Sequence, residues 1–153
     1  MPVQKLKEYL DKNKVKYVSI RHSTVYTATE IAASAHVKGK NLAKTVMVKI
    51  DGTMTMAVLP AKFRVDLEAL RAACLAGTAE LATEHEFAKL FSNCEEGAMP
   101  PFGNLYGLPV YVEKSLTEDE EIAFNACSHS ELIQLAYKDF AHLVKPTVAS
   151  FKA

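Results

Sequence analysis

Hydrophobic positions recur with two different periods along the chain, and each change of period separates an expected helix from an expected strand. Over residues 3–13 the apolar side chains return at helical spacing, which predicts an amphipathic helix. A second helix is expected to begin at Thr27, because Thr27 and Glu30 have the spacing of a capping box. Three further helices are predicted by N-cap or stop signals over residues 66–74, 83–91 and 138–144.

The strongest strand signal is a pair of β-prone runs, residues 43–50 and 53–60, on either side of Asp51-Gly52. Asp-Gly in this position is typical of a two-residue hairpin turn. Pairing across the turn sets Lys44 opposite Leu59. Shorter strands are expected over residues 15–20, 110–112, 121–127 and 132–135. Short strands interrupted by helices predict an α+β fold with a mixed, curved sheet, in a single domain over residues 1–153.

The composition is that of an ordinary globular protein, with 49% hydrophobic and 24% charged residues. Lys plus Arg equals Asp plus Glu at 18 each, so the net charge neither favours nor excludes a nucleic-acid partner. The sequence shows no signal-peptide pattern and no apolar run long enough to span a membrane. The three cysteines and five histidines lack metal-ligand spacing. We therefore expect a cytoplasmic protein with reduced thiols, no metal site and no membrane partner.

The segment from residue 95 to residue 103 contains Pro100 and Pro101 in series, with Gly97 shortly before them. Two prolines remove two backbone donors and fix φ at both positions, so neither a helix nor a central strand passes through them. The amides around Gly97 and Ala98, with no large side chain over them, could receive a carbonyl oxygen or an oxyanion. The alternative is a rigid surface turn without a ligand.

Lys44 is the most informative charged residue. Strand alternation places it on the same face as Val46, Val48 and Ile50. A lysine on an apolar face either extends its ammonium group to solvent or meets an anion. Lys44 is thus either a solvated lysine at a strand end or a cation at the mouth of a pocket. Five basic residues flank the hairpin and the loop before it. Such clusters are usually solvated surface, but around Lys44 they could create a positive field for a phosphate backbone: Arg21, Lys38, Lys40, Lys62 and Arg64.

A third candidate segment, residues 125–130, ends an apolar strand with small polar side chains. Cys127 and His129 are two residues apart, so on a regular strand they would share a face. This spacing permits a thiol–imidazole pair. It equally permits Cys127 to be a small core residue, the usual position of a free cysteine, with His129 in a loop.

Taken together, these segments resemble the YbaK/prolyl-tRNA synthetase-associated editing family. The resemblance runs from the expected helix start onward and depends on the order of its motifs. These are residues 26–32, 43–46, 57–61, 64–67, the GxxxP turn at 97–101, 105–110, Ser128-His129 and Asp139-Phe140. One departure is Cys127, since members often have glycine at this position.

The resemblance implies a barrel-like mixed sheet flanked by helices and a trans-editing deacylase that needs no cofactor. Its substrate would be the acceptor end of a tRNA that carries the wrong, small amino acid. Alanine on tRNA-Pro is the first expectation, and cysteine, serine or threonine are the others. Prolyl-tRNA synthetase is a possible partner, and DNA is not expected. The implied catalytic residues are Lys44, Gly97 and His129. The implied substrate-binding residues are Tyr26, Thr27, Ala98, Met99, Pro100, Pro101 and Ser128.

Three other functions are compatible with the same residues. A non-catalytic module could bind tRNA ends or a nucleotide in the same pocket without hydrolysing an ester. A cysteine hydrolase would use Cys127 and His129 as its nucleophile and base. A regulator would bind a small metabolite there. The editing mechanism differs from the cysteine hydrolase because it needs no covalent nucleophile, since an aminoacyl ester is already activated.

Overall fold

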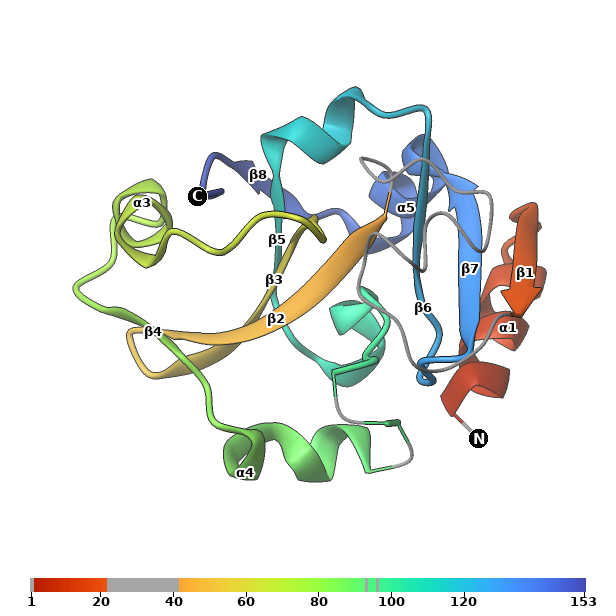
Figure 1. Ribbon diagram of the computed structural model, residues 1–153, viewed down its shortest axis with the longest axis horizontal. Helices are drawn as coiled ribbons and strands as arrows, with labels where there is room; N and C mark the ends of the chain where they lie inside the picture. The colour runs from red at the N-terminus through yellow and green to blue at the C-terminus, as the bar shows by residue number, and fades with distance from the viewer. Residues whose placement is uncertain (1, 22–41, 93, 96) are drawn as a thin grey trace.

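A computed structural model describes residues 2–21, 42–92, 94–95 and 97–153. In these ranges the strands form one sheet of three strands, in the order β1-β7-β6, and one of five, in the order β4-β2-β3-β5-β8 (Figure 1). Helices flank both sheets, which confirms the predicted α+β class. The predicted helix from Thr27 lies outside the described residues.

The predicted hairpin forms the centre of the larger sheet. Strands β2 (Ala43–Ile50) and β3 (Thr53–Pro60) pair antiparallel, with Lys44 opposite Leu59 as expected. Asp51 and Gly52 both have positive φ, 50° and 80°. Two such residues are what a tight primed turn requires, so the local sequence fixes the register of the hairpin.

The remaining strands of this sheet make it mixed. β4 (Ala79–Leu81) pairs antiparallel with β2. β5 (Val110–Glu113) runs parallel to β3, and β8 (Thr147–Ala149) runs parallel to β5. The prediction of a mixed, curved sheet is therefore confirmed.

The smaller sheet is antiparallel throughout. Its middle strand β7 (Glu131–Ala136) pairs with β1 (Tyr17–Arg21) on one side and β6 (Glu121–Asn125) on the other. A single parallel bridge between Leu42 and Ala123 joins the beginning of β2 to β6. Within the described strands the two curved sheets meet at this corner and do not close into a barrel.

The described helices occur where apolar periodicity, N-caps or stop signals predicted them. α1 spans Pro2–Lys12 and α5 spans Tyr137–Val144. Asp66 caps α3 (Leu67–Ala73) by accepting the Ala69 amide. Thr83 and Glu86 form the predicted capping box of α4 (Glu84–Phe87), which continues as the 3-10 helix η2 (Ala88–Phe91). Two further 3-10 helices are η3 (Gly103–Tyr106) and η4 (Lys114–Glu118).

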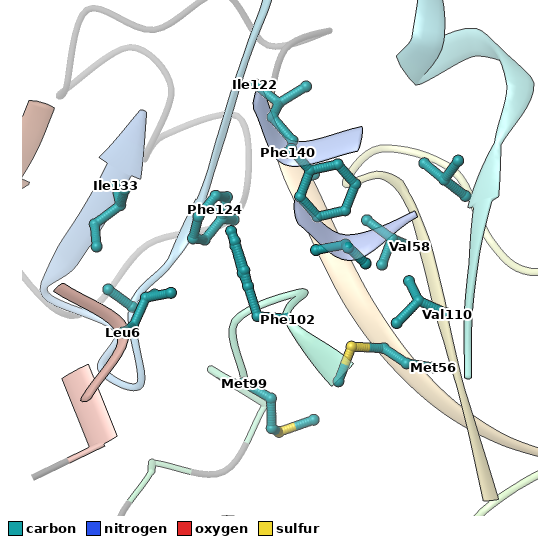
Figure 2. Packing of buried hydrophobic residues seen from close by; sticks show 14 of the residues in the cluster. Leu6, Met56, Val58, Met99, Phe102, Val110, Ile122, Phe124, Ile133 and Phe140 are labelled. Atoms are coloured by element: carbon teal, nitrogen blue, oxygen red, sulfur yellow. The ribbon is translucent and has the colours of Figure 1, made fainter. Parts of the chain in front are cut away.

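The main core fills the space between the sheets (Figure 2). Phe102, directly after the two prolines, is fully buried, and its ring lies edge-on to Phe124 at 5.6 Å and to Phe140 at 5.5 Å. Such aromatic contacts bury large areas in a defined geometry. The double-proline segment is therefore anchored to β6 and α5, which fixes the position of the turn before it.

The other face of the larger sheet carries a second cluster, which includes Val48, Leu59, Leu70 and Phe151. Val46 and Ile50 pack against it, so the predicted apolar face of β2 is real. Among the described helices, none is long and apolar enough to cross a membrane.

Candidate active site

A tight turn at residues 95–98 presents Gly97 at the surface. The Ala98 amide donates to the Glu95 carbonyl at 3.0 Å, and Gly97 has φ +79°. A turn with positive φ at its third residue favours glycine there. Gly97 is exposed, whereas Ala98, Met99, Pro100 and Pro101 are buried. The Ala98 amide is thus used within the turn, which corrects the expectation that it faces a ligand. Gly97 and Glu95 are both exposed.

The turn is joined to the loop between β6 and β7 by backbone hydrogen bonds. Cys127 donates to the Ala98 carbonyl at 2.9 Å, and its own carbonyl accepts from Glu95 at 2.9 Å. The His129 amide donates to the Glu95 carboxylate at 3.0 Å. These bonds hold two segments together that are about 30 residues apart in the sequence.

His129 lies directly against Gly97. A Cβ atom built on Gly97 would be 3.6 Å from the imidazole Cε1 and 3.8 Å from Nε2. These are ordinary contact distances, so the imidazole forms one side of the space above the glycine. The structure therefore brings together two of the predicted catalytic residues.

Cys94 and Cys127 form a disulfide in this structure, across the same two segments. The expectation of three reduced thiols is therefore wrong for this pair, because their spacing of 33 residues gives no sequence signal. Cys74 is the free cysteine. Cys127 is buried, as expected, and a disulfide sulfur is not a thiolate, which removes Cys127 as a nucleophile in this state. Its φ of 65° is one that glycine adopts easily.

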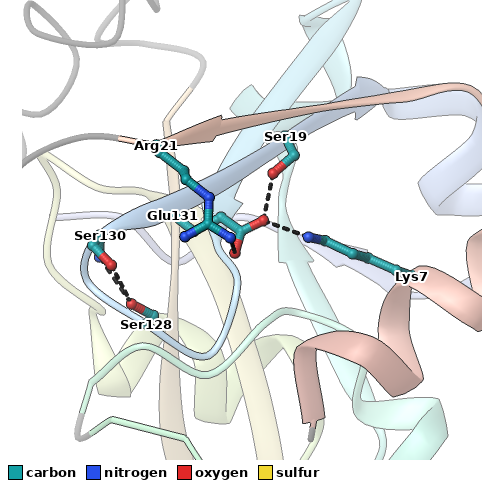
Figure 3. A network of polar contacts seen from close by, with 6 residues as sticks. All are labelled: Lys7, Ser19, Arg21, Ser128, Ser130 and Glu131. Carbon is teal, nitrogen blue, oxygen red and sulfur yellow. Dashed lines mark hydrogen bonds and ion pairs between the residues drawn. The ribbon is translucent and has the colours of Figure 1, made fainter.

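Ser128 turns toward its own loop. Its hydroxyl lies 2.7 Å from that of Ser130 and accepts the Ser130 amide at 3.0 Å. Glu131, which follows Ser130, is buried at the beginning of β7 (Figure 3). Lys7 of α1 forms an ion pair with its carboxylate at 2.7 Å, and Ser19 of β1 donates a hydrogen bond to it. The loop is thus closed on itself and anchored to α1 and β1.

The pKa of Glu131 reflects the same contacts. Burial alone would raise the pKa of the carboxyl group, but hydrogen bonds from Lys7 and Ser19 lower it below its ordinary value. Arg21 adds a longer ion pair at 3.9 Å, mostly through solvent because Arg21 is exposed. The carboxylate is therefore ionised at neutral pH and binds α1 and β1 to the end of the His129 loop.

A recess of about 280 Å³ separates the turn from strand β2. Its walls are mostly apolar and come from β2, β4, α4 and the turn: Thr45, Val46, Met47, Leu81, Ala82, Glu84, Phe87, Gly97 and Met99. Gly97, which has no side chain, contributes backbone atoms to this surface. A larger cavity of about 420 Å³ lies elsewhere, beside Asp119, Tyr137 and Lys138, and none of the predicted site residues lines it.

Lys44 lies at the beginning of β2, one residue from the recess wall but not in it. Its side chain is half-buried, and burial, with the charge of Arg64, lowers the pKa of the ammonium group. In the described part of the chain no carboxylate forms an ion pair with it. Alternation places Lys44 on the face of β2 that carries Val46, whereas Met47 is on the opposite face; both Val46 and Met47 line the recess.

Four of the other predicted residues lie outside the described part of the chain: Tyr26, Thr27, Lys38 and Lys40. Lys62 is exposed, its ammonium group 5.2 Å from the Phe63 ring centre. In the described ranges no group of three His, Cys, Asp or Glu residues is placed to hold a metal ion.

Sequence reasoning missed Cys94 and Glu95, because their roles depend on contacts with residues 127–129 that no local pattern predicts.

Comparison with known proteins adds the family and the fold. Residues 22–143 match the family described as the aminoacyl-tRNA editing domain. No curated protein matches the chain. A crystal structure of a hypothetical protein superposes with a TM-score of 0.85 at 18% identity, covering 97% of this chain and 99% of that one. A protein proposed to be a trans-editing enzyme for prolyl-tRNA synthetase superposes with a TM-score of 0.84 at 21% identity, covering 99% and 97%.

Proposed function

Because this chain belongs to the aminoacyl-tRNA editing domain family, we propose that it is a deacylase that hydrolyses the ester of a small amino acid on tRNA. Alanine on tRNA-Pro is the first candidate, followed by cysteine, serine and threonine. The observation that carries the proposal is the recess of about 280 Å³ between β2 and Gly97, with His129 against the glycine. The prolyl-tRNA synthetase partner belongs to the same proposal, supported by the likeness to a protein proposed to edit for that synthetase.

A small recess suits the task of editing. A synthetic site discriminates poorly against a smaller amino acid, because a missing methylene is worth only about 1–3 kcal/mol. A second pocket that admits small side chains and excludes larger ones supplies the missing discrimination. Phe87, Met47 and Met99 lie in the wall of this recess. Its volume of about 280 Å³ would hold either side chain, so the expectation that an alanyl group is accepted and a prolyl group is rejected comes from the proposed editing task.

The Gly97 amide is the proposed oxyanion donor. Water adds to the ester carbonyl, and the negative charge that develops on the carbonyl oxygen is stabilised by this N–H group. The bond from carbon to the ribose oxygen then breaks, and that oxygen takes up a proton, which leaves a free amino acid and a ribose hydroxyl. Loss of one oxyanion donor typically raises a barrier by about 2.7–4 kcal/mol. His129 would position the water or the amino acid, with help from the neighbouring ribose hydroxyl.

Lys44 is assigned to a phosphate group outside the recess. It is not among the residues that line the recess, Arg64 is a neighbouring cation, and no carboxylate in the described residues forms an ion pair with it. A terminal phosphate of the tRNA would supply the missing negative charge. The Lys44 ammonium group would then hold the acceptor end while the ester lies at Gly97.

A deacylation panel tests the proposal. Purified protein is mixed with tRNA-Pro charged with alanine, cysteine, serine, threonine or proline, and the ester that remains is followed over time. We expect hydrolysis of at least the alanyl ester and none of the prolyl ester. Tight binding of these tRNAs with no hydrolysis of any of them would instead support a non-catalytic binding module.

A further inference from the structure

The disulfide lies between the two segments that carry Gly97 and His129. Cys94 and Glu95 precede the turn, and Cys127 precedes His129 in its loop. The three hydrogen bonds that join these segments also involve only residues 95–98 and 127–129. The covalent link and the hydrogen bonds thus join the same two segments, those that carry Gly97 and His129.

Cys127 has a backbone conformation that does not suit a cysteine. Its φ of 65° is in the left-handed region, which costs a residue with a Cβ about 1–2 kcal/mol relative to the ordinary helical region. Glycine would avoid this cost. Two backbone hydrogen bonds, with Ala98 and Glu95, hold Cys127 in this conformation, and the bond to Cys94 is a further contact that only a cysteine can make.

The two cysteines also differ in exposure. Cys127 is buried, at 6% exposure, whereas Cys94 is half-buried. Cys94 is therefore the residue of the pair that we assign to the first contact with a thiol or disulfide reagent in solution. Thiol–disulfide exchange needs such an approach to one sulfur, with the second thiol close behind it.

We propose that Cys94 and Cys127 form a reversible thiol–disulfide pair whose oxidation holds the Gly97 turn against the His129 loop and sets the rate of ester hydrolysis. This rests on the proposed function. The oxidant is a low-molecular-weight disulfide such as oxidised glutathione. The Cys94 thiolate attacks one of its sulfur atoms and releases one glutathione, and the Cys127 thiolate then displaces the second. Two protein thiols lose two electrons and two protons, and one glutathione disulfide becomes two thiols.

Reduction loosens the site without unfolding it. The three hydrogen bonds remain, and Phe102 still anchors the segment in the core. The Gly97 amide and the imidazole are then held less closely, and a misplacement of about 1 Å can cost a factor of about 10² in rate. We expect kcat to fall about tenfold on reduction, within that bound. KM should change less, since Lys44 and most of the recess wall lie on β2, β4 and α4, and only Gly97 and Met99 come from the turn.

The experiment compares protein oxidised with glutathione disulfide and protein reduced with dithiothreitol. Alkylation followed by mass measurement counts the free thiols: one, Cys74, in the oxidised form and three in the reduced form. Single-turnover deacylation of Ala-tRNA-Pro is measured on both. We expect the wild type and the control variant Cys74→Ser to lose rate on reduction and to recover it on reoxidation. Cys94→Ser and Cys127→Gly should have the reduced rate in both conditions.

A second readout separates this inference from the proposed function. Amide hydrogen exchange of residues 94–101 should accelerate on reduction in the wild type and not in Cys94→Ser. If the tRNA panel shows no hydrolysis, the proposed function fails while faster exchange on reduction still supports the thiol pair. Three free thiols after oxidation, or a rate and an exchange pattern that reduction leaves unchanged, would overturn it.

Discussion

Replacing Gly97 by alanine separates the role of this residue in catalysis from its role in the backbone. Its φ of +79° is unfavourable for alanine by about 1–2 kcal/mol. The added Cβ itself would fit, because the nearest atom, Cε1 of His129, is 3.6 Å away. The cost to stability is therefore a backbone cost, and it should lower Tm by about 2–8 °C for a chain of this length.

The catalytic effect should be much larger. Relief of the strain rotates the peptide groups on either side of residue 97, and the amide no longer points at the ester carbonyl. Loss of an oxyanion donor corresponds to a fall in kcat of about 10²–10³. Deacylation of Ala-tRNA-Pro is measured at a temperature where both proteins are folded, with Tm from thermal unfolding.

Gly107→Ala is the matched control. Gly107 also has positive φ, +71°, and a Cβ there would meet nothing within 4 Å. It should therefore lose a similar amount of stability and keep its activity. A Gly97→Ala variant with normal kcat, or a Gly107→Ala variant that loses as much activity, would refute the assignment of the oxyanion contact to Gly97.

Substitutions at Lys44, Glu95 and Glu131 test the surrounding contacts, with Lys49 as a control. Lys44→Ala should lower deacylation by orders of magnitude, whereas Lys49→Ala, which removes ion pairs with Glu80 and Glu86, should change it less than about threefold. Because the pKa of Lys44 is lowered, the enzymatic rate, corrected for spontaneous hydrolysis, should fall with rising pH before an ordinary lysine would lose its proton. Glu95→Ala should lower kcat about tenfold by releasing the His129 amide, and Glu95→Gln, which retains an acceptor oxygen, should restore most of it; equal rates for the two would contradict this role. Glu131→Gln should lower the unfolding free energy at pH 7 by about 1 kcal/mol, measured in urea. Since the pKa of Glu131 is lower when folded, the wild type should lose this advantage as the pH falls below 4.5.

Local signals were sufficient to predict much of the fold. Asp51-Gly52 fixed the hairpin and the pairing of Lys44 with Leu59, because a two-residue turn leaves one register. Asp66 and Thr83 predicted helix starts, because each side chain satisfies an amide of the first turn. These interactions join residues that are close in sequence, so a pattern can reveal them.

The site depends on contacts that such patterns do not encode. The sequence suggested Gly97 and His129 separately, yet only the tertiary structure shows the imidazole against the glycine. It gave no sign that the Ala98 amide is used inside the turn or that Cys127 pairs with Cys94. Glu131 follows a polar loop and was not singled out, although Lys7 and Ser19 make it a buried anchor. Each of these facts requires segments that are far apart along the chain to pack together.

The central claim is that the recess beside Gly97 receives the acyl group of the substrate. A crystal structure with adenosine carrying alanine in a non-hydrolysable 3′-amide bond tests this most directly. The account predicts the alanyl methyl group inside the recess and the carbonyl oxygen about 2.7–3.1 Å from the Gly97 nitrogen. Binding of the analogue in the larger cavity beside Tyr137 and Lys138, with the recess empty, would contradict it.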